Sequence, residues 1–351
     1  MSYTNGLDKP SDYFNTVLYT GNGTARNITT GLTTTDWVWI KRRDGTANHR
    51  LTDVVRGATN MLSSNNTNAT QTHAQTVTAF GTNTFSLGTD SGSYDVNTNS
   101  QTYASWNWSA GGSASSNTDG SITSTVSANT TAGFSIVSYT GNETVSTIGH
   151  GLGVTPSMII VKGMIAARNW IVGHHTQGWT KSAMLDETNA FSSQTHWNNT
   201  APTSSVFTIE GGSNSNVNTN NAGYIAYCFA EKTGYSKFGS YVGNGSSDGT
   251  FCFTGFKPAF VMVKRSSGAD NWMITDNKRS SSGGNNVIDR RILPNLSNAE
   301  FTNTSPMDLL SNGFKHRDGD DINNASGSTY IYMAFAEKPF VTSTGIPTTA
   351  R

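Results

Sequence analysis

The stretch Phe14–Gly23 (FNTVLYTGNG) decides the fold, because it returns twice further along the chain. Its second copy is Phe134–Glu143 (FSIVSYTGNE), and its third is Phe238–Gly245 (FGSYVGNG), which lacks two residues. Each copy combines β-branched and aromatic residues with a Gly-Asn turn signal, a pattern typical of a strand that ends in a tight turn. A block that recurs at long intervals indicates a chain built from repeated units.

Two further blocks recur with nearly constant spacing. One is a short apolar run that ends in lysine, and the other is an aromatic run that begins with tyrosine. The first block's tyrosine lies 22 or 23 residues before the lysine, and the lysine lies 62 to 66 residues before the last block's tyrosine. The copies are Trp37–Lys41, Met158–Lys162 and Phe260–Lys264, then Tyr103–Trp108, Tyr224–Phe229 and Tyr330–Phe335. The spacing predicts three units of about 100 residues each, a common size for a β-sandwich.

The composition favours the same architecture. Ser, Thr, Asn and Gly make up roughly 47% of the 351 residues, far above ordinary usage. Disordered chains are also polar, but they lack the 16 Phe, 12 Tyr and 8 Trp found here. We therefore predict an all-β fold of three tandem β-sandwich repeats of the jelly-roll or lectin-like kind.

The predicted domain boundaries follow the blocks. A segment rich in Ser, Gly and Thr separates the first two repeats and is typical of a flexible linker. The predicted parts are an N-terminal segment 1–12, repeat 1 at 13–110, the linker 111–133, repeat 2 at 134–232, repeat 3 at 233–340 and a C-terminal tail 341–351.

Charge and hydropathy exclude several classes of partner. The chain has 23 basic and 23 acidic side chains and a pI near 7.1, so no cationic field attracts nucleic acid or an anionic membrane. No apolar run approaches the roughly 18 residues that span a bilayer, and the first residues lack the pattern of a secretory signal. Two cysteines are too few for a disulfide framework. We expect no nucleic acid partner, no membrane insertion and no cofactor.

Comparison of the copies separates scaffold positions from variable ones. Trp37, Met158 and Phe260 share one slot, and all are large and apolar, so we predict that such positions fill the sandwich interiors. The recurrent lysine that follows them is predicted to pack its stem on the sheet and keep its ammonium group in water.

A second pattern concerns charged pairs. Asp53 and Arg56 stand three residues apart in the first unit, and Asp276 and Arg279 take the same places in the third. Both charges are missing from the second unit. Loss of both together is expected for partners of an ion pair, because a buried charge left alone is costly. We predict two structural ion pairs.

Two tryptophans belong to the second unit alone. Trp179 and Trp197 sit in polar sequence, and His196 and Asn198 flank the second of them. An exposed indole beside amides can stack on a sugar ring, so these four residues are the candidate glycan or receptor site. The alternative is that the two indoles plug the end of the sandwich or a subunit interface.

No catalytic motif is present, and we predict that the protein is not an enzyme. Carboxylates from distant loops could still converge, so a glycosidase stays open. Adjacent histidines on a strand point to opposite faces, which argues against a metal site at His174–His175. The turn at Asp318–Asp321 lacks the ligand spacing of an EF-hand. We predict no metal site.

Four stretches resemble repeat-containing virion proteins of marine tailed bacteriophages, including cyanophages. They are Leu7–Gly23, Asp36–Lys41, Asn48–Gly57 and Tyr103–Trp108. The resemblance covers all three units, most closely the first. It implies a location in the virion and a structural or tail-fibre-like role, and it supplies no catalytic residues.

These observations together predict a bacteriophage virion structural protein. The favoured role is a tail fibre or spike component that binds a host-surface glycan. The alternatives are a capsid decoration or tail-assembly protein without a receptor role, and a polysaccharide depolymerase. The expected partners are other virion proteins, further copies of the chain, with a trimer favoured, and a host-surface polysaccharide.

Overall fold

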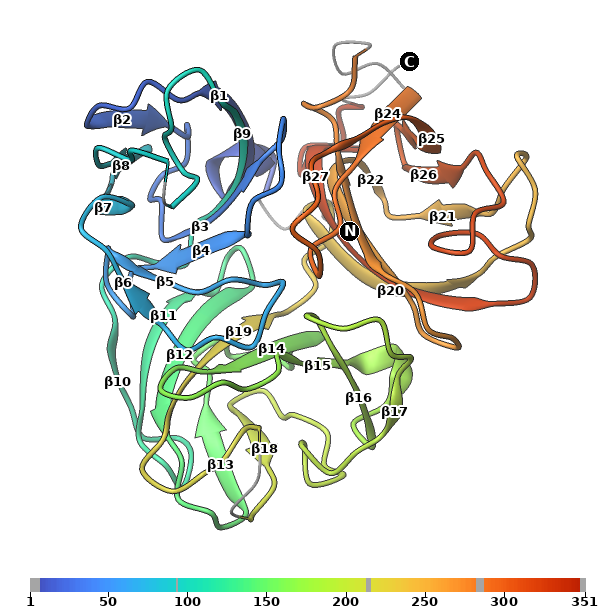
Figure 1. Ribbon diagram of the computed structural model, residues 1–351. Helices are drawn as coiled ribbons and strands as arrows, with labels where there is room; N and C mark the ends of the chain where they lie inside the picture. The colour runs from blue at the N-terminus through green and yellow to red at the C-terminus, as the bar shows by residue number, and fades with distance from the viewer. Residues whose placement is uncertain (1–6, 93, 213–215, 282–286, 348–351) are drawn as a thin grey trace.

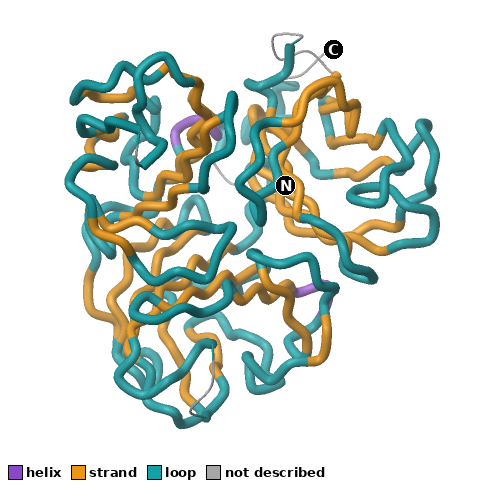
Figure 2. Tube along the Cα trace, in the orientation of Figure 1, coloured by secondary structure: helices purple, strands orange, loops and turns teal. Residues whose placement is uncertain are grey.

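The computed structural model describes residues 7–92, 94–212, 216–281 and 287–347. Nearly all of its regular structure is strand, and only two single 3₁₀ turns interrupt it, η1 (Pro10–Asp12) and η2 (His175–Gln177) (Figure 2). The prediction of an all-β fold is confirmed. No helix in these ranges is long and apolar enough to cross a membrane.

The first unit pairs a four-stranded sheet with a three-stranded one. The larger sheet has the order β1-β9-β3-β4 and the smaller one β2-β8-β7, and a short hairpin β5-β6 follows β4. The strands are β1 (Phe14–Thr20), β2 (Arg26–Thr29), β3 (Trp37–Arg42), β4 (Arg50–Asp53), β5 (Asn60–Met61), β6 (Gln71–Thr72), β7 (Val77–Gly81), β8 (Thr84–Leu87) and β9 (Thr102–Trp108).

The second unit has an eight-stranded sheet and a two-stranded one. The orders are β10-β11-β12-β19-β14-β15-β16-β17 and β13-β18. The strands are β10 (Ser115–Asn117), β11 (Ser124–Asn129), β12 (Phe134–Thr140), β13 (Ser146–Gly149), β14 (Met158–Gly163), β15 (Ile171–His174), β16 (Lys181–Met184), β17 (Ser192–Ser193), β18 (Val206–Ile209) and β19 (Gly223–Phe229).

The third unit consists of two four-stranded sheets. Their orders are β20-β27-β22-β23 and β21-β26-β25-β24. The strands are β20 (Ser236–Val242), β21 (Phe251–Phe253), β22 (Phe256–Arg265), β23 (Trp272–Asp276), β24 (Val287–Arg291), β25 (Phe301–Leu310), β26 (Gly313–His316) and β27 (Thr329–Pro339).

The same strand order recurs in one sheet of each unit. In each unit the last strand lies between two earlier strands and pairs with both, in the orders β1-β9-β3-β4, β12-β19-β14-β15 and β20-β27-β22-β23. The three units lie around a common centre, and each contacts both others (Figure 1). We call this arrangement the ring. That the units are copies of one sandwich module stays a prediction.

The recurrent large side chains lie between the units and not inside the sandwiches. One buried cluster combines Trp37 of the first unit, Tyr227 of the second and Phe260 of the third. The Trp37 and Tyr227 rings stack with centroids 4.4 Å apart, and Phe14 stacks on Phe335 at 5.1 Å. The prediction that these positions are buried holds, but the interior they fill belongs to the whole ring. Aromatic contacts of this kind contribute about 0.5–1.5 kcal/mol each beyond their buried area.

Strand alternation explains the difference. Successive side chains of a strand point to opposite faces, so Trp37 and Trp39 of β3 face the centre while Val38 and Ile40 face the smaller sheet. In the first unit, these smaller side chains of β3 fill the sandwich interior together with residues of the smaller sheet such as Phe85 and Leu87. The strands of a sheet that is buried on both faces have apolar residues at consecutive positions.

The segment 111–133 is not a flexible linker, and that prediction is wrong. It forms β10 and β11, and β11 pairs antiparallel with β12 over Thr125–Asn129. Val126 joins the outer core of the second unit, and Ile122 packs against it. β11 thus lies between β10 and β12 and is partly buried despite its high Ser and Thr content.

Candidate functional site

The polar residues that recur in the units gather at the three seams of the ring. A five-residue stretch of each unit lies against the next unit, and we call these stretches the docking loops. They are residues 63–67 on the second unit, 184–188 on the third and 293–297 on the first. Each unit thus gives one docking loop and receives one, which closes the ring.

The recurrent lysines donate to the last carbonyl of the docking loops. Their side chains are fully buried, so the prediction of ammonium groups in water is wrong. The contacts are Lys162 Nζ to Thr67 O at 2.7 Å, Lys264 Nζ to Thr188 O at 3.1 Å and Lys41 Nζ to Ser297 O at 3.3 Å. Burial lowers the pKa of each lysine to about 8.

An aromatic ring nitrogen contacts the first carbonyl of each docking loop. This residue follows an asparagine that stands seven residues after the recurrent lysine in each unit, and it is tryptophan in two units and histidine in the other. The contacts are Trp170 Nε1 to Ser63 O at 2.9 Å, Trp272 Nε1 to Met184 O at 2.9 Å and His49 Nε2 to Leu293 O at 3.1 Å. The three seams therefore use the same pair of contacts in the same direction.

The predicted ion pairs lie at two of these seams. Arg56 Nε lies 2.6 Å from Asp53 Oδ2, and Arg279 Nε lies 2.5 Å from Asp276 Oδ2, with all four side chains buried. The neighbouring unit completes the first pair, because Tyr227 Oη donates to Asp53 Oδ2 at 2.8 Å.

Trp106 of the first unit completes the second pair. Its Nε1 donates to Asp276 Oδ2 at 2.9 Å. Trp106, Tyr227 and Met333 occupy one slot in the three units, and the methionine has no donor. The third seam accordingly lacks the acceptor as well, since His174 replaces the aspartate there.

His174 is fully buried, and its Nδ1 lies 2.9 Å from Thr176 Oγ1. Its Nε2 has no hydrogen-bond partner among the described residues. Burial lowers the pKa of His174 to about 3, and the neighbouring His175 adds to the shift. The seam between the second and third units thus holds a neutral imidazole where the other two hold ion pairs.

The predicted glycan-binding tryptophans are buried, which corrects that assignment. Trp197 is 0% exposed and Trp179 is 8% exposed, and their rings meet edge to face at 5.4 Å. Both rings fill the space beside Gly173, where the other units carry Thr52 and Thr275. The exchange of a threonine for a glycine makes room for the rings. The alternative interpretation, that they plug the sandwich, agrees with this position.

The two residues beside Trp197 also have local structural contacts. His196 is buried, and its Nδ1 lies 2.8 Å from Ser182 Oγ. Asn198 is half-buried in a turn with a φ of 48°, and its backbone N–H donates to Thr195 O. The four candidate residues are therefore close together, but neither indole offers a face to a sugar.

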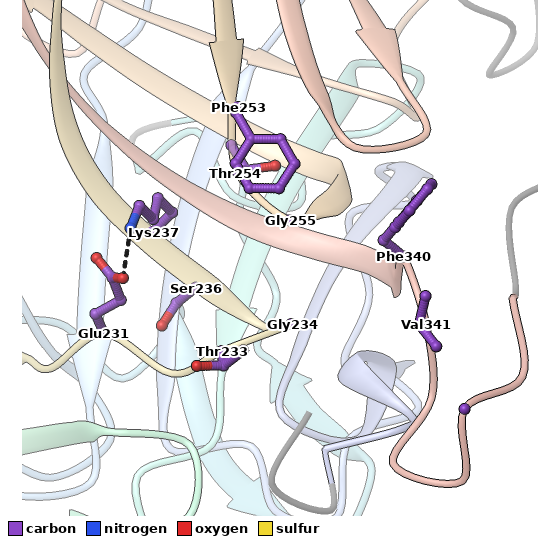
Figure 3. A pocket seen from close by; sticks show the side chains of 11 residues that line it. Glu231, Thr233, Gly234, Ser236, Lys237, Phe253, Thr254, Gly255, Phe340 and Val341 are labelled. Atoms are coloured by element: carbon purple, nitrogen blue, oxygen red, sulfur yellow. Dashed lines mark hydrogen bonds and ion pairs between the residues drawn. The ribbon is translucent and has the colours of Figure 1, made fainter. Parts of the chain in front are cut away.

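A groove opens on the outer side of the third unit. Its volume is about 590 Å³, and it lies between the start of β20, the end of β21 and the tail that follows β27 (Figure 3). Phe253 is 60% exposed and Phe340 39% exposed at its mouth, and Lys237 pairs with Glu231 at 2.6 Å on its other side. This is an apolar opening with a neutralised polar rim.

A model of a domain of unknown function, DUF7483, matches residues 9–339. The chain belongs to this family. The match runs through all three units. Searches of curated proteins and of solved structures gave no match.

The remaining reactive groups of this DUF7483 chain are also held in structural contacts. Cys228 and Cys252 are buried free thiols, and burial raises the pKa of both. In the turn at Asp318–Asp321, Asp318 accepts from Asn323 and Asp320 pairs with Arg291. Within the described ranges, no group of three or more His, Cys, Asp or Glu residues could hold a metal ion.

Proposed function

We propose that this chain is a structural protein of a bacteriophage particle. The resemblance of its first unit to phage virion proteins supports the proposal. A polar chain of zero formal net charge supports it as well, because such a chain depends on surface shape more than on a charged field to choose partners.

The use of the recurrent polar groups carries the proposal. Lysine and aspartate are common catalytic residues, yet here they and the arginines bind the units to one another. Lys162 binds a loop carbonyl, and Asp53 is shared by Arg56 and Tyr227. A chain that uses its strongest polar groups in this way is suited to be a rigid building block.

Within the particle, we propose that the chain binds neighbouring virion proteins and does not bind a host glycan. The residues that suggested glycan binding, Trp179 and Trp197, are covered by protein. The open groove of the third unit is instead bordered by two exposed phenylalanines. A decoration or tail-assembly role fits such a surface.

Electron microscopy of intact particles tests the proposal. An affinity tag after Arg351 is labelled with gold in particles purified from a lysate, and untagged particles serve as the control. We expect gold at a fixed place on the particle, on the capsid lattice for a decoration protein or on the tail for an assembly or fibre protein. Tagged chain in the lysate but none on purified particles would contradict the proposal.

A further inference from the structure

The three units close one side of their sandwiches in three different ways. This side lies between the first strand of the unit and the loop after the second strand, where each unit has a glycine with positive φ: Gly31, Gly151 or Gly255. In the first unit, the Asn15 side chain bridges the opening and donates to Thr30 O at 2.7 Å. The second and third units lack this asparagine and carry Ser135 and Lys237 in its place.

In the second unit, the strand β11 covers the opening. Its last residues pair with Phe134 and Ser135 at the start of β12. Ser124 Oγ donates to Gly149 O at 2.8 Å, and Val126 lies against Gly151. The added strand therefore contacts both lips of the opening.

In the third unit, the counterparts of these residues line the empty groove. The strand register corrects the two-residue gap assumed for the third copy of the first block. Ser236 pairs with Phe335 as Phe134 pairs with Phe229, so Ser236 and Lys237 stand where Phe134 and Ser135 stand. Phe253 and Gly255 likewise stand where Gly149 and Gly151 stand, because each glycine of positive φ follows the end of its strand, β21 or β13, by two residues. In the part of the chain that the structure describes, no strand pairs with the outer edge of β20, and a single bridge joins Ser236 at its start to Lys232.

The geometry points to this groove as a binding site for an extended strand of a partner protein. The occupant is an uncharged segment of about six residues made of small and β-branched side chains, like Ser124–Asn129 in the second unit. Main-chain hydrogen bonds to a sheet edge give such a strand its affinity, and side-chain pockets give its specificity.

The groove also sets limits on the strand. In the second unit, the Asn117 side chain lies against Gly149. Phe253 stands at the position of Gly149 in the third unit, and its ring takes the space of that asparagine, so the partner strand must end or carry a small residue at this point. A β-branched residue at the place of Val126 would reach Gly255 between the two exposed rings. The strand would also displace the exposed His175 side chain, whose Nε2 lies 2.8 Å from Phe238 O. The inference stands on the internal comparison and not on the proposed virion role.

A peptide titration tests the site. The probe is a fluorescein-labelled synthetic peptide with the sequence of residues 122–131, and binding to the full chain is followed by fluorescence anisotropy. We expect saturable binding that becomes at least tenfold weaker with Phe253→Ser or Phe340→Ala. Phe251→Ser is the matched control, because Phe251 is 44% exposed on the same strand but does not line the groove. Amides of Ser236–Val242 should exchange more slowly with deuterium when the peptide is bound.

Several outcomes would overturn the inference. They are no binding at 1 mM peptide, equal binding by the Phe253→Ser variant, and equal losses with Phe253→Ser and Phe251→Ser. Self-association of the chain that Phe253→Ser abolishes would assign the groove to a second copy. Binding to a glycan array that Phe253→Ser abolishes would assign it to a sugar. Gold on the particle, as expected above, is independent of all these results.

Discussion

Gly173→Thr puts into the second unit the residue that the other two units carry. A Cβ atom at this position would lie 2.5 Å from Trp179 Cζ3 and 2.7 Å from Trp197 Cε2. Carbon atoms in contact lie about 3.5–4.0 Å apart, so the rings must shift by about 1 Å in an interior that is already closely packed. Overpacking of this kind costs about 1–3 kcal/mol of unfolding free energy.

The assay is the thermal unfolding midpoint of the full chain. With an unfolding entropy of about 2.1 cal/mol/K per residue, a chain of 351 residues has roughly 0.7 kcal/mol/K in total if the ring unfolds as one unit. The cost above then lowers the midpoint by about 1.5–4 °C. Trp197→Ala alone leaves a cavity and costs about 3–5 kcal/mol.

The double variant decides the reasoning. Because the added threonine side chain occupies part of the space that the indole leaves, Gly173→Thr with Trp197→Ala should be more stable than the sum of the two single changes predicts. Contacting residues show coupling of about 0.5–3 kcal/mol. An unchanged midpoint for Gly173→Thr, or strict additivity in the double variant, would refute the assignment of the two rings to this space.

Three further predictions concern the seams. Lys162 has a pKa lowered from 10.5 to about 8 in the folded chain, so unfolding is accompanied by proton uptake at this side chain between pH 8 and 10.5. The stability of the wild type should therefore rise from pH 8 to 9.5 relative to Lys162→Met, by at most about 1.4 kcal/mol per pH unit, as measured by urea unfolding. Asp53→Asn should lower the unfolding free energy by about 3–5 kcal/mol because it leaves Arg56 buried without its partner. Asp53→His combined with Arg56→Gln, the pair found in the second unit, should cost less. An equal loss of unfolding free energy in both variants would contradict the paired role. His174 has a pKa lowered from 6.5 to about 3, so its contribution to stability is present above pH 6.5 and is lost as the pH falls toward 3. In His174→Gln, the unfolding free energy should therefore fall less steeply between pH 6.5 and 3 than in the wild type. An unchanged slope would argue against this assignment.

The strands could be predicted from the sequence, but the partners of their faces could not. Trp37–Ile40 is apolar at every position, which indicates burial on both faces. Such a run does not show which face meets the smaller sheet and which meets a neighbouring unit. The size difference between Trp37 and Val38 was the available signal, because the larger residues fill the wider space between three sheets.

The seams were hidden for a related reason. A lysine at the end of an apolar strand most often reaches water. The carbonyls of Arg168 and of Thr67, which is far along the chain, make burial of Lys162 acceptable. The misassigned tryptophans could have been recognised through Gly173, which breaks a slot otherwise filled by threonine. A small residue in one copy that accompanies a large residue elsewhere in that copy indicates packing against it.

The asymmetry of the ring then indicates where partners bind. Contacts that repeat at all three seams close the molecule on itself, so they offer nothing to a second protein. Of the three outer openings, a side chain bridges the first and a strand covers the second, while the third keeps Phe253 and Phe340 exposed. Exposed apolar patches on a soluble surface indicate a site of interaction. The unit that departs from its neighbours at this opening is therefore the one best suited to join the ring to another protein.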